Sequence, residues 1–271
     1  MNTVEKRAAF RRLHESGWFV MPNPWDAGSA RLLQGLGFKA LASTSAGMAW
    51  AKGLPDGRVD LDDVLRHLSM LAASVDVPLN ADFENGHADA AEAVAKNVAR
   101  AVETGIAGLS IEDSTGNGAS PLYDFEDAVA RIAAARRAID ASGTGVVLTA
   151  RSEGFIRGRP DLEETIRRLT AFSQAGADCL YAPGIQAPEQ IAAVVKAVAP
   201  KPINVLTLGH SAATLAGLGV RRISVGGSLA RVAWTAFLGA AREIAEHGTF
   251  ESFSNAAPGS ELNRAFAQQS K

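Results

Sequence analysis

The sequence predicts an α/β protein, a (β/α)8 TIM barrel formed by a single domain of residues 1–271, from three observations. The length of 271 residues is usual for one such barrel. Eight short, apolar, strand-like runs recur along the chain, and helical spacing follows each of them. This alternation is typical of parallel strands that crossover helices bury on both faces. An open, doubly wound sheet is the competing architecture, and we favour the closed barrel.

The strands and helices are expected in strict alternation. The strand signals lie at residues 18–22, 41–45, 77–83, 108–113, 145–151, 178–183, 201–207 and 221–227. Helical spacing is clear in residues 89–105, 122–140 and 161–176, and the last of these begins acidic and ends in Gly, as helices prefer. Glycines shortly before the next strand suit helix C-terminal caps on the opposite rim: Gly105, Gly143, Gly176 and Gly219.

A helical extension, residues 228–271, is expected after the eighth strand. Residues 228–248 form a long apolar helical pattern, and the tail behind it carries Phe250, Phe253 and Phe266. This is more aromatic surface than a free tail should expose. We expect the tail to pack either on a neighbouring subunit or back on its own barrel.

The composition excludes several classes of function. The net charge is −2, with acids and bases interspersed, so no basic surface for nucleic acid is expected. No run of 18 apolar residues occurs, so no membrane partner is expected. Cys179 is the only cysteine, which excludes an intramolecular disulfide and fits a reducing compartment. The charged N-terminus lacks the apolar core of a secretory signal. We therefore expect a cytoplasmic protein.

Acidic side chains end the third and fourth predicted strands, where a barrel carries its chemistry. Asp82 and Glu84 are two residues apart and project to the same side, and Glu112 lies one strand along. Three carboxylates without a Cys or His cluster favour Mg²⁺ or Mn²⁺ over zinc. We expect one of the three carboxylates to ligate the ion directly and the other two to hold water molecules that are bound to it. The alternative is that these acids cap strands or pair with surface Lys and Arg.

Arg151 follows an apolar strand, and its guanidinium fork matches a carboxylate or phosphate. It could neutralise charge that develops on a substrate oxygen, or form a structural pair with Glu112, Asp113 or Glu153. The Gly-rich stretch 43–57 offers backbone N–H groups, and its Ser45 adds a hydroxyl.

The other candidates are open at this stage. Tyr181 is either a core tyrosine or a proton donor, and His210 follows the seventh strand as an acid/base candidate. Cys179 is expected to be an inert core thiol. The glycines and serine at 226–228 resemble a phosphate cradle, which keeps a phosphorylated substrate as a rival.

Five short motifs occur in register with the predicted strands: NPWDAGSA (23–30), the STSAG (43–47) and LPD (54–56) pair, DFENG (82–86), SIED (110–113) and TARSE (149–153). Together they resemble the isocitrate lyase and phosphoenolpyruvate mutase superfamily, over nearly the whole chain. The resemblance implies a barrel whose terminal helix is swapped with a neighbour, as a homodimer or homotetramer.

The resemblance also implies the roles of individual residues. It places Mg²⁺ near Asp82, with Glu84 and Glu112 as supporting or water-mediated ligands. A small 2-oxo acid, or its enolate, would chelate the metal, with Arg151 on the anion. The residues that would hold this substrate are Trp25, Ser45, Ala46, Gly47, Asp56 and Tyr181. Ala46 stands where the family usually has Gly, which keeps the N–H but changes the pocket.

The loop at residues 114–124 departs from the family. It has no Cys, Lys or His, so isocitrate or methylisocitrate cleavage is not expected, and of the mutase pattern only Asn117 is present. We therefore expect an Mg²⁺-dependent lyase or decarboxylase. It would cleave a C–C bond of a small 2-oxo or 2-hydroxy acid through a metal-bound pyruvate-like enolate, with Arg151 and Glu112 in catalysis. The alternatives are a phosphonomutase acting on P–C bonds and a non-catalytic barrel that binds oxo acids.

Overall fold

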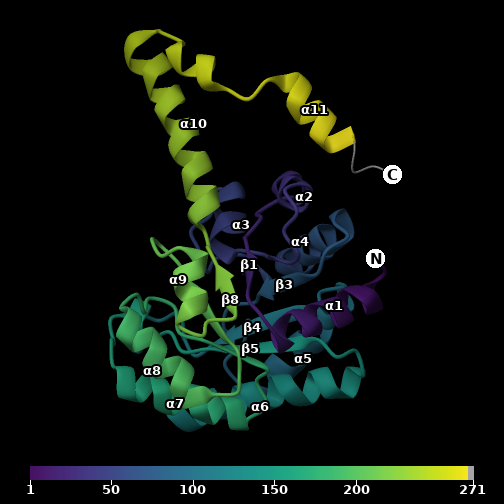
Figure 1. The fold of residues 1–271 in the computed structure, drawn as a ribbon, viewed down its shortest axis with the longest axis vertical. Helices are drawn as coiled ribbons and strands as arrows, with labels where there is room; N and C mark the ends of the chain where they lie inside the picture. Colours follow the sequence, from purple (N-terminus) through teal and green to yellow (C-terminus); the bar gives the residue numbers. More distant parts are fainter. Residues whose placement is uncertain (268–271) are drawn as a thin grey trace.

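The chain forms one sheet of eight parallel strands. Helices lie around these strands (Figure 1). The structure is a computed structural model and describes residues 1–267. Neighbouring strands pair in the order β1-β8-β7-β6-β5-β4-β3-β2. The Ala42 amide donates to the Pro22 carbonyl at 3.1 Å and links the two ends of this order, so the barrel is nearly closed. The strands are β1 Phe19–Met21, β2 Leu41–Ala42, β3 Leu79–Asp82, β4 Gly108–Glu112, β5 Val147–Arg151, β6 Cys179–Tyr181, β7 Ile203–Leu206 and β8 Arg222–Ser224.

Helices follow the strands and surround the barrel, which confirms the predicted (β/α)8 fold and excludes the doubly wound sheet. Each strand of the structure lies inside one of the eight apolar runs that predicted a strand. The Asp26 side chain caps α2 by accepting from the Ser29 amide, and Gly143 ends α6 with a φ of 62°. The helices are α1 Thr3–Glu15, α2 Ala27–Gly35, α3 Ser45–Ala51, α4 Leu61–Ser74, α5 Ala91–Glu103, α6 Phe125–Ser142, α7 Leu162–Gln174, α8 Pro188–Val198 and α9 Ala212–Gly217.

The apolar core lies between the strands and the surrounding helices. Alternate strand residues, such as Leu79, Ile111 and Val205, are buried in this layer. The residues between them point into the barrel, and many of these are polar: Asn80, Ser110, Thr149, Asn204 and Arg222 are all buried. The interior of the barrel is therefore a polar shaft beneath the open mouth.

Helix α1 closes the N-terminal end of the barrel. Phe10 packs with Phe19 and other buried residues at the start of the strands. Arg7 donates to the carbonyls of Val102 and Ile106 at 2.7 and 2.9 Å, and Arg11 donates to the carbonyl of Gly145 at 2.6 Å. Because this end is closed, a ligand has to enter at the C-terminal ends of the strands.

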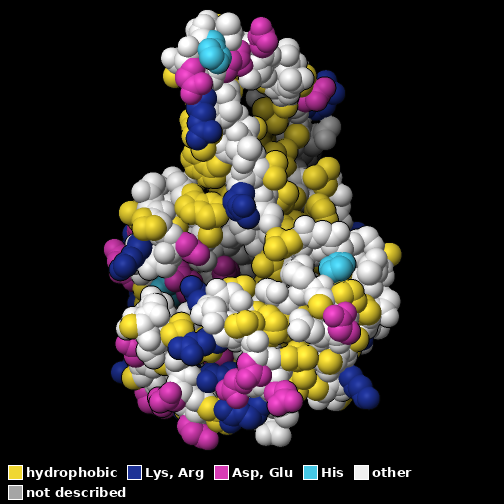
Figure 2. All heavy atoms as spheres, turned by 90° about the vertical axis from the view of Figure 1, so that its left-hand side faces the viewer, with side chains coloured by type: hydrophobic (Ala, Val, Ile, Leu, Met, Phe, Trp, Pro, Cys, Tyr) yellow, Lys and Arg dark blue, Asp and Glu magenta, His cyan; other side chains and the backbone are white. Residues whose placement is uncertain are grey.

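The C-terminal segment leaves the barrel as a long arm (Figure 1). Helix α10 (Ser228–His247) projects outward, the short helix η2 (Glu251–Asn255) turns the chain, and α11 (Gly259–Ala267) packs on α2. Hydrophobic side chains gather along this arm (Figure 2), among them Phe237, Phe250 and Phe253, which are exposed. The tail thus returns to its own barrel at α11, whereas α10 keeps an uncovered apolar face. None of the helices in residues 1–267 combines the length and apolarity that a membrane span requires.

Candidate active site

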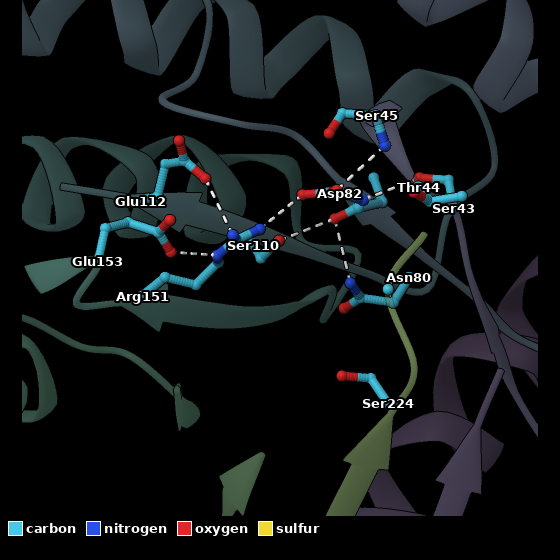
Figure 3. Close-up of polar contacts among 12 residues, drawn as sticks. Ser43, Thr44, Ser45, Asn80, Asp82, Ser110, Glu112, Arg151, Glu153 and Ser224 are labelled. Atoms are coloured by element: carbon cyan, nitrogen blue, oxygen red, sulfur yellow. Dashed lines mark hydrogen bonds and ion pairs between the residues drawn. The ribbon is translucent and has the colours of Figure 1, made fainter. Parts of the chain in front are cut away.

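An arginine at the end of β5 connects the acids at the barrel mouth. Arg151 Nη1 lies 2.7 Å from Asp82 Oδ1, its Nη2 lies 3.1 Å from Glu112 Oε2, and its Nε lies 2.8 Å from Glu153 Oε1. Figure 3 shows the guanidinium between Asp82 on one side and the two glutamates on the other. The parallel register explains this meeting, because Glu112 and Arg151 are direct partners in the β4–β5 pair. Arg151 therefore forms structural ion pairs and also lies at the barrel mouth, so the two roles considered for it are compatible.

Burial makes these charges depend strongly on one another. Desolvation, and then the charge of Glu153, raise the pKa of Glu112 well above its usual value, against the opposing effect of Arg151. Burial alone would lower the pKa of Arg151, but Glu153, Glu112 and Asp82 hold it well above its usual value. Arg157 adds a second cation at 3.2 Å from Glu112 Oε1. The mouth thus contains an excess of acid held by two arginines.

A second group of acids lies on the other side of Asp82. The Ser45 amide, in the first turn of α3, donates to Asp82 Oδ2 at 3.1 Å. Glu84 adopts a φ of 46°, a strained backbone for a non-glycine residue, and its pKa rises to about 7 because of desolvation and the charges of Asp82 and Asp56. The pKa of Asp56 is also raised, by desolvation and by Asp82. Carboxylates that repel one another in this way are an environment suited to a bound cation.

The donor set fits a hard divalent cation. The side chains near Asp82 offer carboxylate and hydroxyl oxygens, which Mg²⁺ prefers over nitrogen or sulfur ligands. In residues 1–267, however, no three His, Cys, Asp or Glu side chains already form a metal-binding group, and Arg151 and the Ser45 amide both engage Asp82. Mg²⁺ usually keeps several waters and takes one or two carboxylates, so Asp82 and Glu84 with waters and a substrate would complete such a site.

Two adjoining cavities open at the mouth and share Ser45, Asp56, Arg151 and Ile156. The inner one, of about 170 Å³, enters the polar shaft, and its lining includes Ser45, Ala46, Asp56, Asp82, Arg151 and Tyr181 from the predicted site. The outer one, of about 770 Å³, is lined by Glu84 and Glu112 as well as residues of the 114–124 loop. Most of the predicted site residues therefore surround one connected space.

Trp25 and Gly47 line neither cavity. The Thr44 side chain caps α3 by accepting a hydrogen bond from the Gly47 amide at 3.2 Å. A side chain at Gly47 would meet Thr44 Cγ2 at 2.7 Å and Trp25 Cβ at 2.9 Å. Both residues thus shape the start of α3, which presents Ser45 to Asp82, and their direct contact with substrate stays a prediction.

The remaining candidates have other partners. His210 Nε2 lies 2.7 Å from the Gln186 carbonyl. The amides of Val225 and Gly226 donate to Asn23 Oδ1 at 3.1 and 2.9 Å, so part of the supposed phosphate cradle is occupied. Cys179 is buried, which raises the pKa of its thiol, as expected for an inert core residue.

Residues that the sequence reading missed belong to the turn after β5 and to the shaft. Arg157 lies in the short helix η1 (Gly154–Arg157), and its spacing of four from Glu153 was the available signal. Arg222 lines the inner cavity from β8. A charged residue inside an apolar strand was the signal for Arg222.

The 114–124 loop covers part of the outer cavity. Thr115, Gly116 and Asn117 line it. Ser114 and Leu122 form an antiparallel bridge at its base, and the Tyr123 hydroxyl donates to Asp89 Oδ1 at 2.6 Å. The loop is therefore anchored at both ends, with its tip over the site.

Comparison with known proteins agrees with this geometry. Residues 10–245 match the protein family described as phosphoenolpyruvate phosphomutase. A crystal structure from Burkholderia cenocepacia with a provisional lyase/mutase designation shares 49% identity, with a TM-score of 0.94 over 98% of this chain and 96% of that one. An oxaloacetate decarboxylase of Paraburkholderia xenovorans is 31% identical over 72% of this chain and 67% of its own. Oxaloacetate acetylhydrolase in complex with its product oxalate is 26% identical, with a TM-score of 0.88 over 99% and 96%.

Proposed function

The chain belongs to the phosphoenolpyruvate phosphomutase family, and on this basis we propose that it is a divalent-metal-dependent lyase or decarboxylase. Its substrate is a small 2-oxo or 2-hydroxy carboxylic acid, and it cleaves a C–C bond next to the oxo-acid group through a pyruvate-like enolate. The observation that carries the proposal is the Arg151 junction with Asp82, Glu112 and Glu153 at the edge of the inner cavity. Family relatives include an oxaloacetate decarboxylase and an oxaloacetate acetylhydrolase, both of which act on oxo acids.

Mg²⁺ or Mn²⁺ is the cofactor that this donor set would hold. Asp82 would be the direct ligand, and Glu84 and Glu112 would hold its waters. The ion would supply Lewis acidity toward the carboxylate and oxo oxygens of the substrate. The neighbouring positive charge would also favour the ionised form of Glu84, whose pKa is about 7 without it.

The side chains of this chain orient the substrate and hold its charge. Arg151, which carboxylates keep protonated, faces the anionic end of the substrate and stabilises the negative charge of an enolate. Ser45 offers its hydroxyl at the start of α3, beside Asp56. Burial raises the pKa of Tyr181 to about 12, so its hydroxyl stays protonated and can donate a hydrogen bond into the cavity.

The test is a turnover assay with a small panel of 2-oxo and 2-hydroxy acids, oxaloacetate included. Pyruvate release is followed by a coupled reduction, with Mg²⁺ or with EDTA, and the metal-catalysed background is subtracted. We expect release above background that requires the metal and is lost in Asp82→Ala and Arg151→Ala. Absence of turnover over the whole panel would remove the lyase proposal.

A phosphonomutase is the alternative that family membership supports equally. Asn117 lines the outer cavity, as one residue of the mutase loop would, but the loop has no Lys. Incubation with phosphonopyruvate, followed by ³¹P NMR, separates this activity from a C–C lyase.

A non-catalytic barrel is the third possibility. Oxalate, which mimics an enolate, would then raise the melting temperature in the presence of Mg²⁺ while no substrate reacts. A ligand at a hundredfold excess over its Kd stabilises a protein by about 2.7 kcal/mol. Turnover of any panel compound excludes this alternative.

We further infer that the active form is a homodimer or homotetramer that works in a reducing compartment such as the cytoplasm. The uncovered apolar side chains of α10 support the assembly, and the single buried cysteine supports the compartment.

A further inference from the structure

A second buried arginine lies inside the barrel, below Arg151. Arg222 is the first residue of β8 and is only 1% exposed. The pairing of the strands joins the two arginines, since Arg151 pairs with Tyr181, Tyr181 with Asn204, and Asn204 with Arg222. Both arginines line the inner cavity of about 170 Å³. A ligand in this cavity therefore has a cation at its mouth and another in the shaft.

The partners of Arg222 are all neutral. Its Nε donates to Asn204 Oδ1 at 2.9 Å, and its Nη1 lies 3.4 Å from His14 Nε2. His14 is held in its neutral form, because burial and then the charge of Arg222 lower its pKa to about 3. Within residues 1–267 no carboxylate forms an ion pair with Arg222, whereas the buried Arg168 pairs with Asp113. Arg131 is also 1% exposed and has no ion pair with an acid in that range, but it donates to the backbone carbonyls of Asp89 and Asn85.

This lack of a counter-ion is costly unless a ligand supplies one. A guanidinium does not lose its proton inside a protein, so burial leaves a positive charge in the shaft. Buried charges are normally paired, because their desolvation is otherwise uncompensated. Ser224 and Asn204 line the same cavity and add neutral hydrogen-bonding groups to the arginine. The shaft is thus built for an anion.

We propose that Arg222, with Asn204 and Ser224, forms a subsite that binds a second carboxylate of the substrate. This inference rests on the proposed function and narrows its substrate to a di-acid. One end is the 2-oxo acid at Asp82 and Arg151, and the other end extends into the shaft. The cavity volume of about 170 Å³ equals roughly six water molecules at about 30 Å³ each, which suits a small di-acid.

The experiment compares matched pairs of acids by calorimetry with Mg²⁺ present. Oxaloacetate is paired with 2-oxobutyrate and 2-oxoglutarate with 2-oxovalerate, since each di-acid resembles its partner except for the distal carboxylate. We expect at least one di-acid to bind wild-type protein roughly 10- to 100-fold more tightly than its partner, the range for a hydrogen bond to a charged group. Arg222→Met removes this preference and leaves oxalate, which occupies the Arg151 end, within about threefold.

Two further variants separate binding from folding. Asn204→Asp places a carboxylate at the atom that Arg222 already contacts, so it satisfies the charge internally, and we expect a folded protein without the di-acid preference. Arg221→Met is the matched control, because Arg221 is the neighbouring arginine and points to the opposite side of the strand. We expect the Arg221→Met variant to bind the di-acid more tightly than its matched mono-acid, as the wild-type protein does.

Two results overturn the inference. One is oxalate binding by wild-type protein without any di-acid preference, which removes the subsite and leaves the proposed function intact. The other is a preference that persists in both Arg222→Met and Asn204→Asp. If neither oxalate nor any oxo acid binds wild-type protein with Mg²⁺, the proposed function falls as well.

Discussion

At the scale of single residues, the site is governed by which charges share one space. Arg151 contacts three carboxylates, while Arg222 contacts none in the described chain. Within residues 1–267 Glu84 forms no ion pair, and Arg151 and Arg157 only partly offset the effect of burial and of Asp82 and Asp56 on its pKa. The number of opposite charges around each charged side chain, rather than its presence alone, therefore indicates whether a ligand could still bind to it.

The geometry of Arg151 predicts that its planar fork matters and not only its charge. Arg151→Lys keeps the positive charge but cannot make the three directed contacts at once. We expect kcat/KM to fall by about 10²- to 10³-fold, the range for losing one group that stabilises a developing oxyanion. Steady-state kinetics on the best panel substrate measures this loss. Arg137→Lys, at an exposed surface pair with Glu92, is the control and stays within twofold of wild type; an active Arg151→Lys would contradict the role.

The raised pKa of Glu84 predicts a stability change with pH in metal-free protein. Its pKa is about 7 when folded and 4.5 in the reference state, so between these values the native state binds more protons than the unfolded state. Stability therefore falls as the pH rises from about 4.5 to about 7, by roughly 2–3 kcal/mol for this group alone. Urea denaturation in EDTA at several pH values, compared with Glu84→Gln, isolates the contribution.

The control is the same series of urea denaturations with Mg²⁺ in place of EDTA. A cation beside Glu84 favours its ionised form and should flatten the difference between wild type and Glu84→Gln. An identical pH dependence in the two proteins without metal would show that Glu84 does not titrate in this window.

At the scale of elements, α3 and the turn after β5 organise the mouth. Helix α3 begins directly after β2, so its first amide reaches Asp82 at the end of β3. The turn after β5 supplies Glu153, which pairs with Arg151, and Arg157, which pairs with Glu112 and Glu153. Predicted strand ends were sufficient to find Asp82, Glu112 and Arg151. They did not reveal Arg157, because it lies in the short 3-10 turn after β5 and not at a strand end, where its spacing of four from Glu153 was the available signal.

Close packing at the start of α3 predicts a specific effect of Gly47→Ala. The added carbon would lie 2.7 Å from Thr44 Cγ2 and 2.9 Å from Trp25 Cβ, so the helix start must shift. We expect a loss of about 1–3 kcal/mol in unfolding free energy, as for other overpacked sites, and weaker oxalate binding because the Ser45 amide moves with α3. Chemical denaturation and calorimetry measure the two effects.

Gly217→Ala is the matched control for this substitution. Gly217 is also helical, and a side chain there meets no atom within 4 Å. The change should be neutral or stabilise by up to about 1 kcal/mol through helix propensity. Equal behaviour of the two variants would remove the role assigned to the α3 contact.

At the scale of the whole molecule, the barrel and the projecting C-terminal arm differ in how well their apolar side chains are buried. The barrel buries its apolar layer between strands and helices, whereas Val232, Phe237 and Leu238 of α10 remain exposed. An apolar face on a projecting helix is typical of an interface between subunits. The predicted homo-oligomer is the arrangement that would cover it.

The arm predicts that assembly depends on α10. Phe237, 60% exposed, lies on the uncovered face, so Phe237→Glu should shift the protein to a monomer in light scattering coupled to size exclusion. Val4→Glu, at a side chain that is 74% exposed on α1, should leave the mass unchanged. A wild-type protein that is monomeric at all concentrations would contradict the assembly.

The sequence by itself determined the eightfold alternation and the strand-end positions of most of the polar residues at the barrel mouth, because apolar periodicity and strand-end position are local properties. Only the tertiary structure decided which of these groups meet. It joined Arg151 to Asp82 across two strand pairings and placed the Ser45 amide against Asp82. Within residues 1–267, it also left Arg222 in the shaft without an ion pair to an acid. Contacts of this kind depend on the register and curvature of strands far apart in the chain, which no local pattern encodes.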